Sequence, residues 1–199
     1  MGAGAALAAA AAAVNHVPLA LDEVGAARAD RGGWSQAAEF ASLILDSGWA
    51  WAALAVAAGW LVSAGLRPTV GAAVGAAGGA VALIAATLVY YLAEWLFVDQ
   101  PLSWGFVTRY WFTASVVLGL PLGAVGATIR RRGLIGVLAA LVVPVGAALN
   151  MVVLPPPAES LMATPVRLTV WACAAAAAVI VLVRAGPGRV PDSAEPATR

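Results

Sequence analysis

The chain has 199 residues, of which 62% are hydrophobic and only 11% carry a charged side chain, and its net charge is +1. This composition is typical of a protein embedded in a bilayer and leaves no room for a large soluble domain. The small net charge excludes the basic face that binding to nucleic acid requires, so no nucleic-acid partner is expected. The only cysteine and the only histidine, Cys173 and His16, exclude a disulfide framework and a thiolate or multi-histidine metal site. We expect neither a metal nor a cofactor.

Apolar segments separated by arginines, prolines and polar turns predict an all-α, polytopic membrane bundle of about six transmembrane helices within residues 1–185. The predicted spans are residues 2–19, 49–66, 70–97, 110–129, 134–154 and 168–183. Residues 34–45 are amphipathic and predict a short helix on the membrane surface, with Phe40, Leu43 and Ile44 towards lipid. Residues 186–199, rich in proline and glycine, predict a disordered cytoplasmic tail.

The third and fourth predicted spans carry glycines at regular spacing. Gly71, Gly75 and Gly79 recur at every fourth position, and Gly119 and Gly123 have the same spacing. Glycines four residues apart lie on one helix face and let a neighbouring backbone approach closely. We therefore expect tight helix packing on both spans.

The positions of the arginines orient the bundle, because arginine is concentrated in cytoplasmic loops. With six spans, Arg67, the triplet from Arg130 to Arg132 and the tail arginines share one side, and most acidic residues lie on the other. This arrangement predicts a multi-pass protein of the cell membrane with both termini in the cytoplasm. Without the alanine-rich first span, the N-terminus would be outside.

Aromatic and polar residues gather towards the outer ends of the predicted spans. The chain has eight Trp, three Tyr and four Phe, and among them only Trp60 falls in the cytoplasmic half of a span. Because an ordinary aromatic belt marks both interfaces, we interpret this one-sided set as the wall of a partly dry vestibule open to the outer leaflet. The candidate substrate-binding residues are Trp49, Trp51, Tyr90, Tyr91, Trp95, Tyr110, Trp111 and Asn150.

Carboxylates at the same level supply candidate chemistry. A carboxylic acid kept protonated by desolvation can protonate an epoxide or an alkene, and aromatic faces stabilise the resulting carbocation. Glu94 is the first candidate for this acid, with Asp46 and Asp99 as reserves, and His16 or Asn15 can orient the acid or accept the final proton. This combination indicates a protonation-initiated terpene cyclase, surrounded by membrane lipid, that acts on a prenylated small molecule.

Each candidate also has a simpler interpretation. Glu94 is either a solvated carboxylate at the interface or the partner of Arg109 in an ion pair. Asp46 precedes a serine and a glycine and fits a helix cap, whereas His16 fits a hydrogen-bonded helix end. The tryptophans serve as membrane anchors in the simplest reading.

The segments LDSGWAW (45–51), YYLAEWL (90–96) and YWFTASVVLGLPLGAVG (110–126) resemble a family of small multi-pass proteins of high-GC bacteria. A chain of this size and character is also similar to the membrane-bound cyclases that fold prenylated indole or diketopiperazine precursors into drimane-type meroterpenoids. The better-known fungal meroterpenoid cyclases have seven spans and use an acidic pair, for which Glu94 and Asp46 are the nearest match. The resemblance implies an enzyme that needs no metal.

Two other functions fit the sequence. A small transporter or permease subunit requires polar groups and broken helices near the bilayer midplane, whereas a non-catalytic accessory protein requires only the glycine faces. The chain has no aspartate-rich run that would hold Mg²⁺ at a diphosphate, which argues against ionisation-initiated cyclisation. Oligomeric state and substrate identity do not follow from the sequence.

Overall fold

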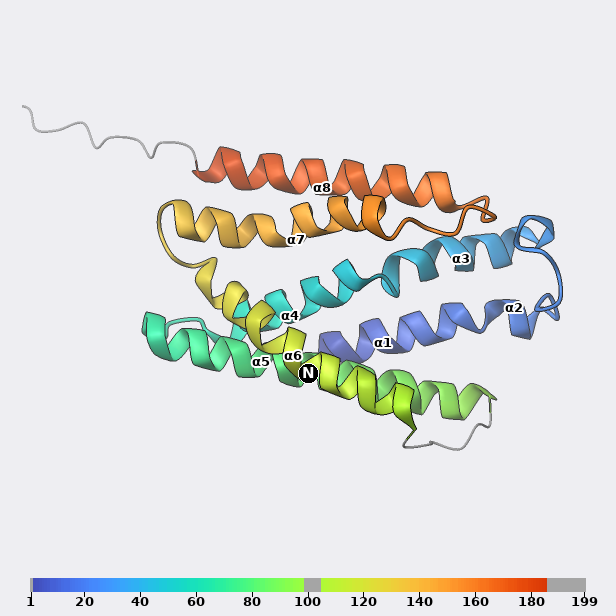
Figure 1. The fold of residues 1–199 in the computed structure, drawn as a ribbon, viewed down its shortest axis with the longest axis horizontal. Helices are drawn as coiled ribbons and strands as arrows, with labels where there is room; N and C mark the ends of the chain where they lie inside the picture. The colour runs from blue at the N-terminus through green and yellow to red at the C-terminus, as the bar shows by residue number, and fades with distance from the viewer. Residues whose placement is uncertain (1, 99–104, 186–199) are drawn as a thin grey trace, which may run out of the picture.

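The computed structural model describes residues 2–98 and 105–185, and within these ranges it contains helices and turns but no strand (Figure 1). The helices are α1 (Gly2–Asn15), α2 (Val17–Ala20), the 3₁₀ turn η1 (Arg28–Asp30), α3 (Gly33–Leu45), α4 (Gly48–Val62), α5 (Pro68–Val98), α6 (Phe106–Thr128), α7 (Leu134–Val153) and α8 (Ala163–Ala185). The predicted all-α class is confirmed. Asp99 and the predicted tail at 186–199 lie outside the described residues.

Four of these helices, α5, α6, α7 and α8, are each long and apolar enough to cross a membrane. The helices α3 and α4 pass the same test only as a pair bent by 51°, which adds a fifth crossing if the pair counts as one. The 14 residues of α1 extend about 21 Å at 1.5 Å per residue, less than the hydrocarbon core of about 30 Å. The protein is therefore a multi-pass helical bundle with four to five such helices, and six spans are not confirmed.

The predicted second span is shorter in the structure because α4 ends at Val62. A turn follows, in which Gly65 adopts a left-handed backbone with φ of 74°. Glycine reaches this conformation without the steric cost of a side chain, and it commonly ends helices in this way. The 15 residues of α4 therefore depend on α3 to complete a crossing.

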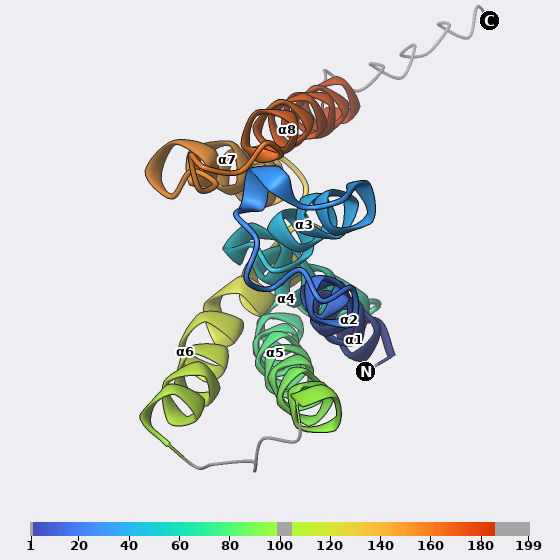
Figure 2. The ribbon, with the colours of Figure 1, turned by 90° about the vertical axis from the view of Figure 1, so that its right-hand side faces the viewer.

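The helices form three layers with α4 in the middle. On one side α4 packs against α5 and α6, and on the other it packs against α7, which pairs with α8. Helix α1 lies along α5 and also contacts α3. Figure 2, which looks nearly along the bundle, shows the α7–α8 hairpin and the α5–α6 pair on opposite sides of the α3–α4 line.

Glycines bring α5 and α6 into direct backbone contact. A Cβ added to Gly75 would lie 2.8 Å from the carbonyl oxygen of Gly123, and one added to Gly79 would lie 2.7 Å from the Cα of Gly123. At Gly119 an added Cβ would lie 2.6 Å from the Cα of Ala80. Helices approach this closely only where side chains are absent, so the predicted glycine packing is confirmed at these positions. We call this region the glycine contact.

Helix α3 lies between other helices, and its apolar side does not face lipid as the sequence suggested. Phe40, Leu43 and Ile44 pack against a buried cluster that α7 and α8 supply, Ala147, Met151, Val166 and Val170. The amphipathic pattern of residues 34–45 is satisfied by protein, because the α7–α8 hairpin covers the apolar face. An amphipathic sequence alone does not distinguish these two partners.

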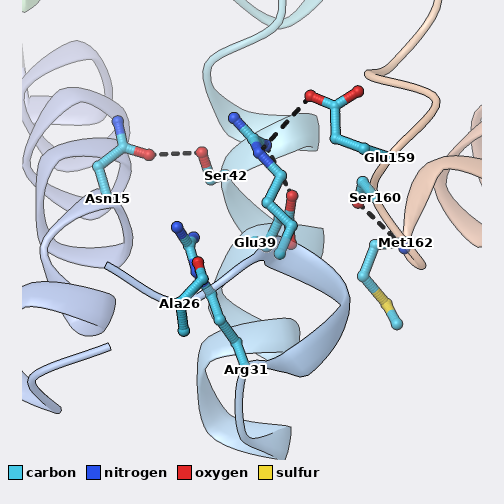
Figure 3. Close-up of polar contacts among 9 residues, drawn as sticks. Asn15, Ala26, Arg31, Glu39, Ser42, Glu159, Ser160 and Met162 are labelled. Atoms are coloured by element: carbon cyan, nitrogen blue, oxygen red, sulfur yellow. Dashed lines mark hydrogen bonds and ion pairs between the residues drawn. The ribbon is translucent and has the colours of Figure 1, made fainter. Parts of the chain in front are cut away.

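An ion pair fastens α3 to the loops at the same end of the bundle. The guanidinium of Arg28 lies 2.7 Å from the carboxylate of Glu39, whose side chain is 7% exposed. The same guanidinium lies 4.0 Å from Glu159 in the turn before α8. Figure 3 shows Glu39 and Glu159 meeting this guanidinium, and Asn15 and Ser42 in contact nearby. A buried carboxylate requires such a partner, and here the partner connects α3 to the α7–α8 hairpin.

Candidate functional site

A cavity of about 430 Å³ lies between α4, α5 and α6. One end of it lies beside the glycine contact, and towards the other end the three helices carry large side chains in place of glycine. Trp51 of α4, Tyr90 and Tyr91 of α5, and Trp111 of α6 line it. The cavity therefore follows directly from the change of residue size along the helices.

The lining changes from apolar to polar along the helices. Leu83, Leu118 and Leu122 line the end next to the glycine contact, and Thr87 with Ser115 comes next. The aromatic side chains form the following level, and Asp46 lies beyond them. From Leu83 to Tyr90 the lining extends about 10 Å along α5, and from Leu122 to Trp111 about 16 Å along α6, at 1.5 Å per residue. We call the end at Asp46 the mouth.

The corner between α3 and α4 places Asp46 at the mouth. Helix α3 ends at Leu45 and α4 begins at Gly48, so Asp46 and Ser47 form the connection. Ser47 has an extended backbone, and its hydroxyl donates a hydrogen bond of 2.6 Å to the carbonyl of Ile44. Short polar side chains compete for backbone hydrogen bonds in this way and favour helix ends. The resulting bend turns the carboxylate of Asp46, an exposed residue, towards the cavity.

Asn15, at the end of α1, connects α3, the α3–α4 connection and α5 at the mouth. Its side-chain nitrogen donates to the carboxylate of Asp46 at 3.3 Å and to the hydroxyl oxygen of Tyr90 at 3.0 Å. Its side-chain oxygen accepts from the hydroxyl of Ser42. An ionised carboxylate only accepts hydrogen bonds, so the nitrogen of Asn15 must be the atom that faces Asp46. We call these four residues the Asn15 cluster.

His16 and Glu94 lie close together beside this cluster. The Nε2 atom of His16 lies 3.7 Å from a carboxylate oxygen of Glu94. The Nδ1 atom lies 2.7 Å from the carbonyl oxygen of Ala12, so it must carry a hydrogen. Nε2 is then protonated only in the imidazolium form, which is the form that pairs with a carboxylate. Glu94 does not line the cavity, so of the two predicted carboxylates that the structure describes, Glu94 and Asp46, it is Asp46 that lines it.

The aromatic rings touch one another across α4, α5 and α6. Trp51 and Tyr90 meet edge to face with ring centroids 6.3 Å apart, and Tyr90 meets Tyr91 at the same distance. Tyr91 stacks on Phe112 with centroids 6.4 Å apart. Such contacts stabilise packed aromatic side chains. Three lining rings, those of Trp51, Tyr90 and Tyr91, are joined in this way, whereas Trp111 of α6 is 52% exposed.

Trp49 and Asn150 lie outside this cavity, although the sequence suggested a single vestibule. They line a second cavity of about 260 Å³ between α4 and α7. Gly48 and Ala52 border both cavities. Because successive residues of a helix are about 100° apart, Trp49 and Trp51 project to different sides of α4. The indole nitrogen of Trp49 is buried and has no hydrogen-bond partner among the described residues.

Trp95 and Tyr110 are also separate from the cavity lining. Trp95 is 47% exposed and Tyr110 is 55% exposed. Tyr110 stacks against Phe106 and meets the ring of Trp111 edge to face. Both residues face outwards, where aromatic side chains favour the membrane interface.

Sequence reasoning did not assign a role to the hydroxyl groups of the site. Thr87 and Ser115 line the cavity, and Ser42 completes the Asn15 cluster. The available signal was a serine or threonine within an otherwise apolar helix, because such residues often bond across helices. Their partners depend on how the helices are aligned, which the sequence pattern leaves open.

The cavity has no cluster of metal ligands near it. Over residues 2–98 and 105–185, no group of three or more His, Cys, Asp or Glu side chains is placed to hold a metal ion. In comparisons with protein families, curated proteins and solved structures, nothing matches this chain. The resemblance to meroterpenoid cyclases stays a prediction.

Proposed function

We propose that this protein is an integral membrane terpene or meroterpenoid cyclase that starts the cyclisation of a prenyl chain by proton transfer. One observation carries the proposal: a largely apolar cavity of about 430 Å³, lined by aromatic rings, has a carboxyl group at its mouth. This volume falls within the range of about 300–1,000 Å³ that is typical of small-molecule sites. A prenyl chain matches the apolar lining.

In this proposal Asp46 is the proton donor, because it lines the cavity and Glu94, the other predicted carboxylate within the described residues, does not. A bound prenyl chain would displace water from the mouth, and a carboxyl group that loses water is protonated more readily. Proton transfer to a terminal epoxide or alkene then creates a carbocation, which attacks the next double bond. The faces of Trp51, Tyr90 and Trp111 stabilise the positive charge without capturing it.

His16 and Glu94 have a different role in the proposal. Their side chains lie 3.7 Å apart next to the Asn15 cluster, outside the cavity lining. We assign these two residues to positioning α1 and the cluster. Cyclisation ends when the carbocation loses a proton, for which the carboxylate of Asp46 is the available base.

We also propose an orientation of the bundle in the cell membrane. Arg67, Arg130 and Arg184 lie at or next to the helix ends opposite the Asn15 cluster (Figure 1). Arg130 covers the ring of Trp60 at 4.4 Å and donates to its carbonyl oxygen. Because arginine favours the cytoplasmic side, this end faces the cytoplasm and the cavity opens towards the outer leaflet. The predicted six spans and cytoplasmic N-terminus would require α1 to complete a crossing.

The glycine contact argues against the transporter alternative. A transporter needs a route from the cavity to the other side of the membrane. In this structure the backbones of Gly75, Gly79 and Gly123 touch immediately beyond the apolar end of the cavity. This backbone contact leaves no gap between α5 and α6 at that level, which disfavours a continuous route to the other side of the membrane.

The test is conversion of linear prenylated substrates by the protein reconstituted in lipid nanodiscs. Farnesylated and geranylgeranylated compounds with a terminal epoxide are supplied, and an isomeric product of unchanged mass is sought by chromatography and mass spectrometry. We expect Asp46→Asn to lower the rate at least about 100-fold, the smaller end of general acid catalysis. The asparagine can still accept the hydrogen bond from Asn15, so folding should persist.

Asp22→Asn is the matched control. Asp22 is an exposed carboxylate with φ of 57°, a conformation that asparagine also adopts readily. This variant should keep full activity, and Glu94→Gln should retain more activity than Asp46→Asn. Conversion of none of these substrates, or full activity in Asp46→Asn, would overturn the proposal and favour a non-catalytic accessory role.

A further inference from the structure

The hydroxyl groups inside the cavity have a definite hydrogen-bond direction. Ser115 donates its single hydrogen to the carbonyl oxygen of Trp111 at 2.8 Å. The oxygens of Thr87 and Ser115 lie 2.9 Å apart, so Thr87 must donate its own hydrogen to Ser115. Both hydrogens are therefore used within the protein. What the pair offers to a ligand is the oxygen of Thr87, which can only accept.

At the mouth, by contrast, the protein offers a hydrogen-bond donor to a ligand. The hydroxyl oxygen of Tyr90 accepts a hydrogen bond from Asn15 at 3.0 Å, and the structure gives that hydroxyl no acceptor among the described residues. Its hydrogen is therefore available to a ligand in the cavity that Tyr90 lines. The cavity thus has a donor at the mouth and an acceptor one helical turn deeper, at Thr87.

We propose that the cavity selects an apolar ligand whose buried part carries a hydrogen-bond donor, a hydroxyl or an N–H group, which bonds to the oxygen of Thr87. A hydrocarbon or an ether adds no hydrogen bond to the one that the Thr87 hydroxyl already makes with Ser115, whereas a hydroxyl or N–H group of the ligand adds a second one. A carboxylate ligand likewise adds none and is also repelled by Asp46. The inference names the substrate class of the cavity and rests on the proposed function only in treating the cavity as the substrate site.

The donor at the mouth and the acceptor at Thr87 also determine how the substrate is oriented in the cavity. An epoxide oxygen accepts hydrogen bonds and carries no hydrogen, so it fits the mouth, where Tyr90 donates and Asp46 supplies the proton. The group with a hydroxyl or N–H fits the level of Thr87 and Ser115. The chain between them folds against the aromatic wall and the apolar end at Leu83, which is the compact shape that ring closure requires.

The experiment compares three probes of equal chain length: a 15-carbon prenyl alcohol, its methyl ether and the corresponding hydrocarbon. Binding is measured without turnover, as the rise in unfolding temperature of the detergent-solubilised protein with probe concentration. All proteins are compared at one detergent concentration, so that partitioning of the probes is the same. A hydrogen bond of ordinary strength predicts that wild-type protein binds the alcohol about threefold to tenfold more tightly than the ether.

Thr87→Val is the decisive variant, because valine has nearly the same shape and no oxygen. Ser115 keeps its bond to Trp111, so the substitution leaves no buried donor unpaired and the fold should persist. The alcohol should then bind no better than the ether. Thr113→Val on α6 is the control, since Thr113 is exposed and bonds to the carbonyl of Arg109 away from the cavity lining.

The outcomes separate this inference from the proposed function. A preference for the alcohol that disappears only in Thr87→Val supports the inference, even if no substrate is converted. Equal binding of alcohol and ether by wild-type protein, a preference that survives in Thr87→Val, or no binding of any probe overturns it. Conversion of a prenyl epoxide with no such preference would support the cyclase and reject the donor requirement.

Discussion

Replacing Gly123 with alanine should destabilise the bundle, although alanine is the better helix former. The added Cβ would overlap the carbonyl oxygen of Gly75 and lie 2.9 Å from the nitrogen of Gly79. Both contacts are with helix backbone, which cannot move aside as a flexible side chain can. Helices α5 and α6 would have to separate along the glycine contact.

The expected size of the effect follows from two opposing terms. Overpacking of a tight interior costs about 1–3 kcal/mol, and the backbone contacts at Gly123 place this site at the upper end. Alanine in place of glycine stabilises a helix interior by about 0.5–1 kcal/mol, which offsets part of this loss. We therefore expect the free energy of unfolding to fall by about 2 kcal/mol, which is a large fraction of the stability of an ordinary domain.

The assay is reversible unfolding in mixed micelles, with Gly146→Ala as the matched control. Gly146 also lies inside a helix, but a Cβ added there meets nothing within 4 Å. That variant should be about 0.5–1 kcal/mol more stable than wild type, since only helix propensity changes. If Gly123→Ala were as stable as Gly146→Ala, the glycine contact would not be the close approach described above.

Two further predictions concern the polar groups at the mouth end. Arg28→Ala should lower the free energy of unfolding by about 3 kcal/mol, because it leaves the buried carboxylate of Glu39 unpaired. Glu39→Gln should lower it by only about 1 kcal/mol, because the side chain of Arg28 is 39% exposed and can turn to water. Thermal unfolding of both variants checks which loss is larger, and a larger loss in Glu39→Gln would contradict the reasoning. Asn15→Leu removes three hydrogen bonds that join α1 to the rest of the bundle and should cost about 2 kcal/mol. Asn150→Leu in the second cavity is its control. An equal loss of unfolding free energy in the two variants would show that the hydrogen bonds of the Asn15 cluster do not stabilise the bundle.

The close packing of α5 and α6 was predictable because it depends on local spacing. Glycines four residues apart lie on one helix face whatever surrounds the helix, and the structure places Gly75, Gly79, Gly119 and Gly123 at the contact. Gly71 shows the limit of this reasoning. It has the same spacing, yet an added Cβ there would make ordinary contacts of 3.7 Å with Leu66 and Ser63, because Gly71 faces the turn between α4 and α5.

The gathering of aromatic and polar residues at one end was also readable from the sequence, but their division between two cavities was not. Trp49 and Trp51 are two residues apart, and only the packing of α4 between α6 and α7 decides which ring faces which cavity. The choice between Glu94 and Asp46 has the same origin. Glu94 projects to the α1 side and meets His16, whereas the bend after α3 turns Asp46 to the cavity.

The sequence by itself determined that this protein is an all-α, membrane-type bundle, because hydropathy and helix propensity act over short stretches of chain. It also determined that small residues at one end give way to aromatic rings and carboxylates at the other. Only the tertiary structure decided that α3 packs on protein, that Asn15 joins Asp46 to Tyr90, and that Thr87 pairs with Ser115 beside a cavity. These features depend on the rotation and alignment of helices that are far apart in the chain, and apolar periodicity leaves both of these undetermined.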